Sequence, residues 1–451
     1  ICCGRSDSEV TENLIGGTTV EARNIISGNG GAGVGISGVL PRVFRNTVQG
    51  NFIGTDVTGT AAIANRAGVG ITESDDNIIG GTESGAGNLI SGNQGTAGVQ
   101  GNGIFITGFA ARNLIQGNFI GTDLTGSRAL GNSKSGVLID EGFDTTIGGT
   151  VAAARNVIAF NGSQGVFLDA GVAFFNNAIR RNSIFSNAAL GIDLSNSFNS
   201  PDGVTPNDQC DGDEGANGLQ NYPALLSAVR SGSATTIQGA LNSAPDKTFT
   251  LEFFSNTECD GSGFGEGKTF IGSTTVTTDS NCNAAFSASL PVAVAAGQFI
   301  TATATDPAGN TSEFSQCVQV AVAFDLCLQG DNDGNLLLVN TTTGEYQFNS
   351  CTGITVSGTA TISIRGCSIL LQHNAPDRRL LARIDACART GTASLQLLSQ
   401  GVRLSITDRD FSNNTCSCAG GQMPASNLTP RRTEVVLRSK RHYYVFSVLS
   451  S

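Results

Sequence analysis

The sequence has no tryptophan, ten prolines and few charged residues, and each scarcity excludes a class of protein. Charged residues are 14% of the 451 residues and glycines number 59, which excludes a coiled coil, a collagen and a charged disordered chain. No apolar run approaches the roughly 18 residues that span a bilayer, so we expect no membrane insertion. Acidic residues outnumber basic ones by 37 to 26, and the net charge of -11 argues against nucleic acid as a partner.

Cysteine is absent between Cys3 and Cys210, and ten cysteines follow from Cys210 to Cys418. This clustering predicts a change of domain near residue 200. No CxxC pair is present, which favours disulfides over zinc and hence a secreted or cell-surface protein. Because the chain starts at Ile1 without a charged and apolar leader, we expect a processed or truncated N-terminus.

Asparagines recur in pairs five residues apart, with Ile or Val two residues after the first. The first members step by 21 to 25 residues, or by about twice that, which indicates a repeat of 21 to 22 residues. Short β-branched runs between glycines predict a coil of strands in each repeat, with asparagine at a turn hydrogen-bonding its copy in the next coil. The predicted structural ladder comprises Asn24, Asn46, Asn88, Asn113, Asn156 and Asn177.

A longer repeat overlies the first one. IGGT recurs at Ile15, Ile79 and Ile147, and NFIGTD recurs at Asn51 and Asn118. With three coils to each long repeat, residues 10 to 198 predict about nine coils, stacked roughly 4.8 Å apart. The motif N-x-I-x-G-N-x-I-G-T-D resembles the parallel β-helix repeats of the pectin-lyase-like superfamily in bacterial exported proteins. That resemblance implies a right-handed parallel β-helix over residues 1–200.

An acidic junction follows at 201–223. Six acids and no Lys or Arg lie between Asp193 and Glu214, and alternating acids in NDQCDGDEG place carboxylate and carbonyl oxygens where they can bind Ca²⁺. A solvated interdomain loop is the alternative. The predicted ligands of Ca²⁺, the one cofactor we expect, are Asp193, Asp202, Asp208, Asp211 and Asp213.

Downstream, about seven alternating strands in 224–322 predict a β-sandwich. Its closing segment, Gly297 to Cys317, resembles bacterial immunoglobulin-like modules. Disulfide pairing is open at this point: Cys259 with Cys282 and Cys210 with Cys317 are two of many permitted pairs. Residues 323–419 predict a small Cys-rich β module, and 420–451 a basic tail, disordered or a fragment's continuation, with no role assigned.

Two functions from different classes fit this all-β chain. The first is a non-catalytic rod that binds extended polysaccharide or a cell-surface glycan, or serves as an adhesin or structural rod. The alternative is a polysaccharide lyase or glycoside hydrolase acting on acidic polysaccharide, with Arg180, Arg181, Asp56 and Asp123 as its candidate catalytic residues. Repetition of Asp56 as Asp123 favours a turn residue over a single active site. Both histidines, His373 and His442, lie outside the predicted solenoid.

Overall fold

The computed structural model describes most of the first 322 residues and separate strands beyond them. The described ranges are 1, 9–38, 42–95, 100–169, 175–196, 201–322, 326–329, 336–340, 344–349, 355–365, 368–375, 378–385, 390–397, 402–407, 417–418, 421–422, 434–438 and 443–447. The chain divides into two compact units. Unit 1 comprises Ile1–Ala228, Ile237–Leu290 and Gly297–Gln319, and unit 2 comprises Val229–Thr236, Pro291–Ala296 and Val320–Ser451.

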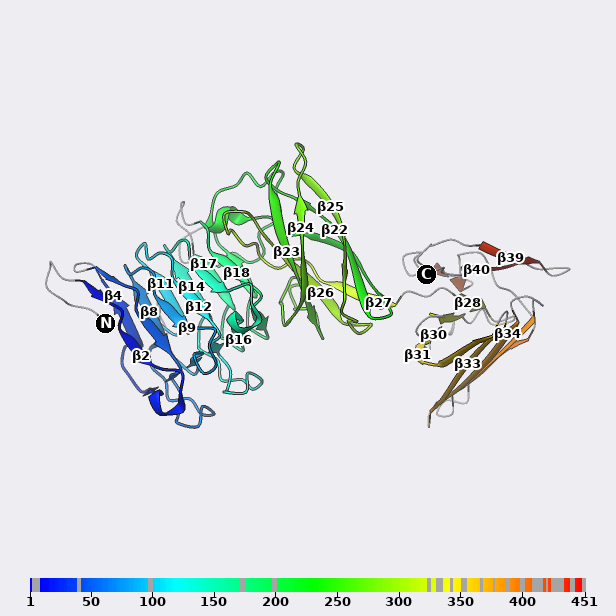
Figure 1. The fold of residues 1–451 in the computed structure, drawn as a ribbon, viewed down its shortest axis with the longest axis horizontal. Coiled ribbons are helices and arrows are strands. Elements are labelled where there is room, and N and C mark those ends of the chain that lie inside the picture. Colours follow the sequence, from blue (N-terminus) through cyan, green and yellow to red (C-terminus); the bar gives the residue numbers. More distant parts are fainter. Residues whose placement is uncertain are drawn as a thin grey trace. The chain divides into compact units, whose positions relative to one another are not determined.

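The first part of unit 1 is a solenoid of short parallel strands, whose stacked arrows run from blue to green in Figure 1. The first sheet contains β2 (Leu14–Gly16), β6 (Thr47–Gln49), β9 (Ile78–Gly80), β12 (Leu114–Gln116), β15 (Thr146–Gly148) and β18 (Ala178–Arg180). The second contains β3 (Ile25–Ile26), β7 (Phe52–Ile53), β10 (Leu89–Ile90), β13 (Phe119–Ile120), β16 (Val157–Ala159) and β19 (Ser183–Phe185). The third contains β4 (Ala32–Ser37), β8 (Ala67–Thr72), β11 (Ile104–Thr107), β14 (Val137–Asp140), β17 (Val166–Asp169) and β20 (Ile192–Leu194). A further pair, β1 (Val10–Thr11) and β5 (Val43–Phe44), and the 3-10 helices η1 (Val20–Ala22) and η2 (Ala152–Ala154) complete this part.

The all-β class and the parallel β-helix are confirmed, but the predicted number of coils is not what the strand pairing gives. Each solenoid sheet has six strands among the described residues, so the solenoid has six coils there instead of about nine. Ile15 pairs with Val48, and Val48 with Ile79, so the IGGT recurrence covers two coils and not three. The same Asn-pair motif serves different corners in successive coils. A step of 21 to 22 residues therefore joins two corners and is shorter than a full turn.

Isoleucine fills the interior of the stack. Along the second sheet, Ile53, Ile90, Ile120, Ile158 and Ile184 have no exposed surface. Their strands are in register, so each side chain packs on the copy one coil away. Burying an aliphatic side chain of this size contributes about 1.5–3 kcal/mol relative to leaving it exposed, so the column stabilises the stack together with the buried side chains of the other two sheets.

Three corners of the solenoid carry asparagine ladders. In each one the side-chain Nδ2 of one Asn donates to the Oδ1 of the next, over 2.8–3.2 Å. The first ladder contains Asn13, Asn46, Asn77 and Asn113, and after Thr145 it resumes at Asn177; the second contains Asn24, Asn51, Asn88, Asn118, Asn156 and Asn182; the third contains Asn29, Asn65, Asn93, Asn132, Asn161 and Asn187. The six predicted ladder residues thus alternate between two corners.

Seven strands follow between 224 and 322, after the short helix η3 (Ala216–Leu219): β21 (Ala224–Ser231), β22 (Ala234–Asn242), β23 (Thr248–Asn256), β24 (Thr269–Thr277), β25 (Asn283–Leu290), β26 (Phe299–Thr305) and β27 (Val318–Val322). Antiparallel pairing joins β23 to β24 and to β26. We call the part of these strands and loops that belongs to unit 1 after residue 236 the downstream β segment.

Two disulfides join described residues of unit 1, and both differ from the predicted pairs. Cys210 bonds Cys282, and Cys259 bonds Cys317. The first joins the acidic junction to the β24–β25 turn, and the second joins the loop after β23 to the start of β27. Spacing along the chain failed to predict these pairs because antiparallel pairing brings together cysteines 58 and 72 residues apart.

Unit 2 contains a four-stranded sheet of β28 (Leu326–Gln329), β29 (Leu336–Val339), β30 (Glu345–Asn349) and β31 (Thr355–Thr359), and a five-stranded sheet of β32 (Thr361–Arg365), β33 (Ser368–Ala375), β34 (Arg378–Asp385), β35 (Thr390–Leu397) and β36 (Val402–Thr407). Two hairpins follow, β37 (Ser417–Cys418) with β38 (Gly421–Gln422) and β39 (Glu434–Arg438) with β40 (Tyr443–Ser447). His373 lies on β33, and its Nδ1 is 2.7 Å from the Tyr346 hydroxyl. His442 lies outside the described residues. No helix in the described chain is long and apolar enough to cross a membrane.

Candidate functional site

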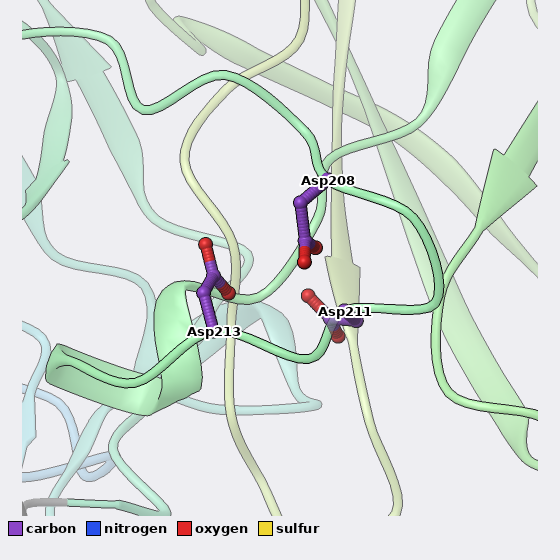
Figure 2. Close-up of side chains that lie close together, drawn as sticks. All are labelled: Asp208, Asp211 and Asp213. Carbon is purple, nitrogen blue, oxygen red and sulfur yellow. The ribbon is translucent and has the colours of Figure 1, made fainter.

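Three of the five predicted metal ligands lie together in the acidic junction. Carboxylate oxygens of Asp208, Asp211 and Asp213 lie within 4.8 Å of one another, and Figure 2 shows the three side chains pointing toward a common point. Asp211 accepts hydrogen bonds from the Ser243 hydroxyl (2.6 Å) and the Asn221 amide (2.8 Å). One carboxylate oxygen each of Asp208 and Asp213 is buried and has no hydrogen-bond partner. A close group of carboxylates, two of which have an oxygen without a partner, fits a hard cation such as Ca²⁺.

The electrostatics of this cluster favour uptake of positive charge. Burial raises the pKa of Asp211 to about 6, against the opposing hydrogen bonds of Ser243 and Asn221. Burial and the neighbouring Asp208 also raise the pKa of Asp213. Carboxylates that share a site disfavour one another's ionisation, so either a proton or a cation stabilises the cluster.

The other two predicted ligands, Asp193 and Asp202, do not join that cluster. Asp193 lies on β20 with 1% of its surface exposed and accepts a hydrogen bond from Gln164 Nε2 (3.0 Å). Burial raises the pKa of Asp193 to about 6, and the charge of Asp202 adds to the rise. These two acids instead face Glu313 of the downstream β segment, whose pKa both of them raise after the larger effect of burial.

Asp56 and Asp123, the repeated candidates, each hold a loop in place. Asp56 accepts from the Thr58 hydroxyl (2.7 Å) and from the amides of Thr60 and Ala61. Asp123 likewise accepts from the hydroxyl and amide of Thr125 and from the amides of Ser127 and Arg128. Strands β7 and β13 are separated by β10, so the two aspartates lie two coils apart, about 10 Å at the strand spacing. We define residues 54–64 and 121–131 as the TD loops.

Glycines in the TD loops bring them against the outside of the second sheet. A Cβ on Gly126 would lie 2.8 Å from the Phe119 ring, and a Cβ on Gly59 would lie 2.8 Å from Leu89. Both glycines have positive φ, at +71° and +67°. The loops therefore cover an external apolar row that includes Phe52, which is 3% exposed, and a turn role accounts for the repeated aspartate.

Arg180 and Arg181 both contact the downstream β segment. The Arg180 guanidinium forms an ion pair with Glu252 of β23 at 2.9 Å, and the Arg181 amide donates to the same carboxylate at 2.8 Å. Glu252 is 1% exposed. The Arg181 guanidinium lies 4.2 Å from the centre of the Phe270 ring. Both arginines thus join the last coil to the downstream β segment.

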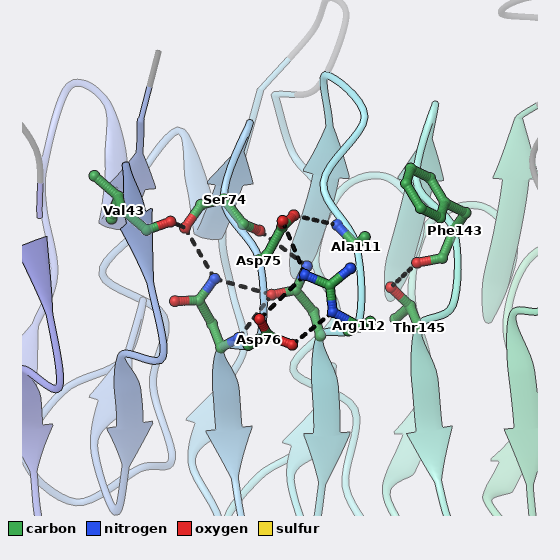
Figure 3. Close-up of polar contacts among 10 residues, drawn as sticks. Val43, Ser74, Asp75, Asp76, Ala111, Arg112, Phe143 and Thr145 are labelled. Carbon is green, nitrogen blue, oxygen red and sulfur yellow. Dashed lines mark hydrogen bonds and ion pairs between the residues drawn. The ribbon is translucent and has the colours of Figure 1, made fainter. Parts of the chain in front are cut away.

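A surface ion-pair group occupies the corner before the first ladder. Arg112 contacts Asp75 (3.0 Å) and Asp76 (2.8 Å) of the preceding coil, as Figure 3 shows. Asp75 also accepts a hydrogen bond from the Ala111 amide (2.9 Å). The Arg112 side chain is about half exposed, at 49%. Because solvent screens such pairs, this group tightens the corner without adding much stability.

Sequence reasoning missed a pair of carboxylates on neighbouring strands of the third sheet. Asp140 at the end of β14 pairs in register with Asp169 at the end of β17. Burial raises the pKa of Asp140 to about 6, and the charges of Asp169 and Glu141 add to the rise. The signal was present, since GVLID and GVFLD end two successive coils in the same way.

Sequence reasoning also missed a cavity of about 270 Å³ beside the last coil. It is lined by Phe185, Ser186, Asn256, Thr257, Glu258, Cys259, Asp260, Gly261, Glu266 and Lys268. Burial raises the pKa of Glu266 to about 7, and hydrogen bonds from Asn187 oppose the rise. Lys268 lies 4.6 Å from the centre of the Phe185 ring, so the cavity wall carries both signs of charge.

Comparisons with known proteins assign no family to the chain. No protein-family model matches the sequence, and no curated protein matches it. Among solved structures, the chain is similar to the enzymatically active domain of bacteriophage CBA120 tailspike protein 2, with 11% identity and a TM-score of 0.19. The match covers 84% of this chain and 52% of that one, so the chain spans about half the length of the structure it matches. Similarity at this level transfers neither an activity nor a substrate.

Proposed function

We propose that this protein works outside the cell and binds extended polysaccharide along its solenoid without cleaving it. The observation that carries the proposal is the pair of TD loops, which repeat the motif GTDxTG and the aspartate contacts of its turn two coils apart. At their tips, Val57 is 72% exposed and Leu124 is 44% exposed. Beside them, the hydroxyls of Thr58 and Thr60 lie 2.6 Å apart in one loop, and those of Thr125 and Ser127 lie 2.6 Å apart in the other.

This combination of groups suits sugar rings. A sugar presents hydroxyls at its edge and an apolar C–H face, and an apolar side chain beside two hydroxyls offers partners for both. A polymer offers the same groups at regular intervals, so a surface that repeats about every 10 Å meets several of them at once. Two disulfides in unit 1 support an oxidising, extracellular location.

The test is a binding screen against acidic and neutral polysaccharides that also follows the absorbance of unsaturated products and released reducing ends. We expect retention without products. The double variant Val57→Asp/Leu124→Asp should weaken retention at least tenfold. Leu226→Asp is the matched control, because Leu226 is 73% exposed and lies on β21, outside the solenoid. Equal loss in both variants, or no retention by the unaltered chain, would overturn the proposal.

A glycoside hydrolase is the second candidate, and one observation favours it. Burial and the charge of Asp169 raise the pKa of Asp140 to about 6, and Asp140 pairs in register with Asp169. A protonated acid beside a second carboxylate is the arrangement that glycosidic bond cleavage requires. Released reducing ends that disappear in Asp140→Asn, while retention persists, would establish this activity in place of simple binding.

We also propose that Asp208, Asp211 and Asp213 bind Ca²⁺. Support comes from their mutual approach and from the two buried oxygens without partners. We expect millimolar Ca²⁺ to raise the melting temperature of the chain, and Asp211→Asn to abolish that increase. Asp202→Asn is the control, because Asp202 is exposed and stands apart from the cluster. An equal Ca²⁺ response in Asp211→Asn would refute this site.

A further inference from the structure

The last coil of a solenoid has an open edge. Strands β18, β19 and β20 are the edge strands of their sheets, and the described residues form no seventh coil beside them, so their outward N–H groups need other acceptors. The chain supplies these from residues more than 70 positions downstream. Ile184 exchanges two backbone hydrogen bonds with Gly267, each 2.9 Å long, and the Ile179 amide donates to the Thr311 hydroxyl at 3.0 Å. The downstream β segment therefore covers this edge.

Glu266 takes the position that the next asparagine would have in the third ladder. Asn187 donates to Glu266 Oε1 from its amide (3.1 Å) and from its Nδ2 (2.8 Å). Within the ladder, Asn161 donates from the same two groups to the Oδ1 of Asn187. Glu266 is 7% exposed, so a carboxylate ends the ladder in a largely dry environment.

Glu313 covers the end of the third sheet in a similar way. Its two carboxylate oxygens accept hydrogen bonds from the amides of Leu194 and Thr205, both at 3.0 Å. Glu313 is 3% exposed. Together with Glu252, which accepts from Arg181, these residues place three buried carboxylates across the last coil.

The charged groups around the three carboxylates differ. Glu252 faces Arg180 and Arg181, so its charge is compensated. Around Glu266 the charged groups are Asp260, Glu258 and one cation, Lys268. Around Glu313 they are Asp193 and Asp202. Burial raises the pKa of the neighbouring Tyr222, and the charge of Glu313 adds to the rise. Glu313 thus faces acids on the solenoid and on the junction.

We propose that the downstream β segment is a proton-controlled cap of the solenoid, which binds tightly while Glu266 and Glu313 are protonated and loosens when both are ionised. Protonated, each carboxyl still accepts hydrogen bonds and carries no charge into a dry contact. Ionised, both lie at a site where burial and neighbouring acids oppose charge. Release into water removes that penalty, so ionisation favours the open state.

The direction of the pH dependence follows from the raised pKa values. Burial raises the pKa of Glu313 to about 8 and that of Glu266 to about 7. The docked state consequently binds more protons than the released state between about pH 5 and pH 8. Docking is strongest at the acid end of this window. It weakens up to roughly tenfold per pH unit for each carboxyl that ionises on release.

Hydrogen exchange of the full chain from pH 5.5 to pH 9 tests the cap. After correction for intrinsic exchange rates, the amides of Asn187 and Leu194 should lose protection as pH rises, by at least tenfold relative to the interior ladder amide of Asn118. In Glu266→Gln/Glu313→Gln, which removes both charges and keeps one acceptor oxygen at each position, the protection ratio should stay flat. Unchanged protection of Asn118 in this variant shows that the solenoid is folded.

Two results would overturn the proposal. In the first, the amides of Asn187 and Leu194 track Asn118 across the whole pH range in the unaltered chain. In the second, the double Gln variant keeps the pH slope of the unaltered chain, which would place the titrating groups elsewhere. Neither result bears on polysaccharide retention, because the TD loops lie on coils two and four and make no contact with these glutamates.

Discussion

Replacing one interior ladder asparagine should destabilise the solenoid far more than replacing an exposed one. Asn118 makes five side-chain contacts. Its Oδ1 accepts from the amide and Nδ2 of Asn88 (3.0 and 2.9 Å), and its Nδ2 lies within 3.0 Å of the Ile79 carbonyl, the Gln116 carbonyl and Asn156 Oδ1. Asn118 is 1% exposed, so water cannot replace these partners in Asn118→Ala.

The expected cost follows from those contacts. A buried group left without its partner costs about 1–3 kcal/mol. Asn118→Ala removes the acceptor of both Asn88 donors and the Nδ2 donor to the Ile79 and Gln116 carbonyls, so the total is roughly 3–5 kcal/mol. Asn13→Ala is the matched control, because Asn13 lies on the same kind of corner but is exposed and only donates, to Asn46 and to the Thr11 carbonyl. Its loss should cost less than about 1 kcal/mol.

Urea unfolding followed by far-ultraviolet circular dichroism measures both free energies of unfolding. The ladder contributes as described only if Asn118→Ala is destabilised by at least about 2 kcal/mol more than Asn13→Ala. Equal losses in the two variants would refute the reasoning. They would show that the isoleucine column holds the coils together by itself and that the asparagines merely fit the turn.

Three further outcomes are expected. Arg180→Ala should cost about 3–5 kcal/mol in unfolding free energy, because it removes the ion-pair partner of the buried Glu252. Arg112→Ala should cost less than about 1 kcal/mol, because its ion pairs are half exposed. Similar values for both variants would contradict this. Gly126→Ala should cost about 1–3 kcal/mol more than Gly203→Ala, since both have positive φ but only Gly126 has a ring within 3 Å of the added Cβ; chemical denaturation compares them. Between pH 6 and pH 9 the melting temperature should fall more in the unaltered chain than in Glu313→Gln. The folded-state pKa of Glu313 lies above its unfolded value, so its stabilisation is lost as pH rises through about 8. A parallel fall of the melting temperature in the two chains would contradict this.

Features encoded within a few residues were predictable from the sequence. Ile, Val, Asn and Gly at fixed offsets indicated stacked parallel strands, and the solenoid has them. The spacing of Asp208, Asp211 and Asp213 indicated an oxygen cluster, and these side chains do come together. In both cases local backbone geometry is enough to place the side chains, so a short motif contains the information.

The number of coils was mispredicted for a physical reason. Asn24 and Asn46 carry the same motif but lie at different corners, because Asn24 bonds Asn51 and Asn46 bonds Asn77. One motif fits every corner, since each corner needs the same turn and the same side-chain donor. Motif spacing therefore measures the distance between corners. Only the strand pairing shows how many corners make a coil.

The contacts of the cap could not be predicted from the sequence, because each of its residues is a common residue type for its position. Glu252 lies within an alternating strand, where a glutamate normally faces solvent, and nothing nearby shows that it meets Arg180. Glu266 lies in a glycine-rich loop that has the composition of a surface turn. Partners separated by more than 70 residues form contacts that no local pattern records, and the disulfide pairs were missed for the same reason.

The polarity of the ladders determines what kind of group can end them. At the end of the third ladder, Asn161 donates from its amide and Nδ2 to Asn187 of the following coil, and Asn187 donates from the same two groups. The terminal partner has only to accept, and the carboxyl of Glu266 does so. The first ladder ends differently, because Asn217 accepts from the Asn177 amide and donates back to the Asn177 and Thr311 carbonyls. A neutral amide completes that corner without a titrating group. The cap responds to protons where a carboxyl accepts from the last coil. A carboxyl can end the third ladder because that ladder donates toward it.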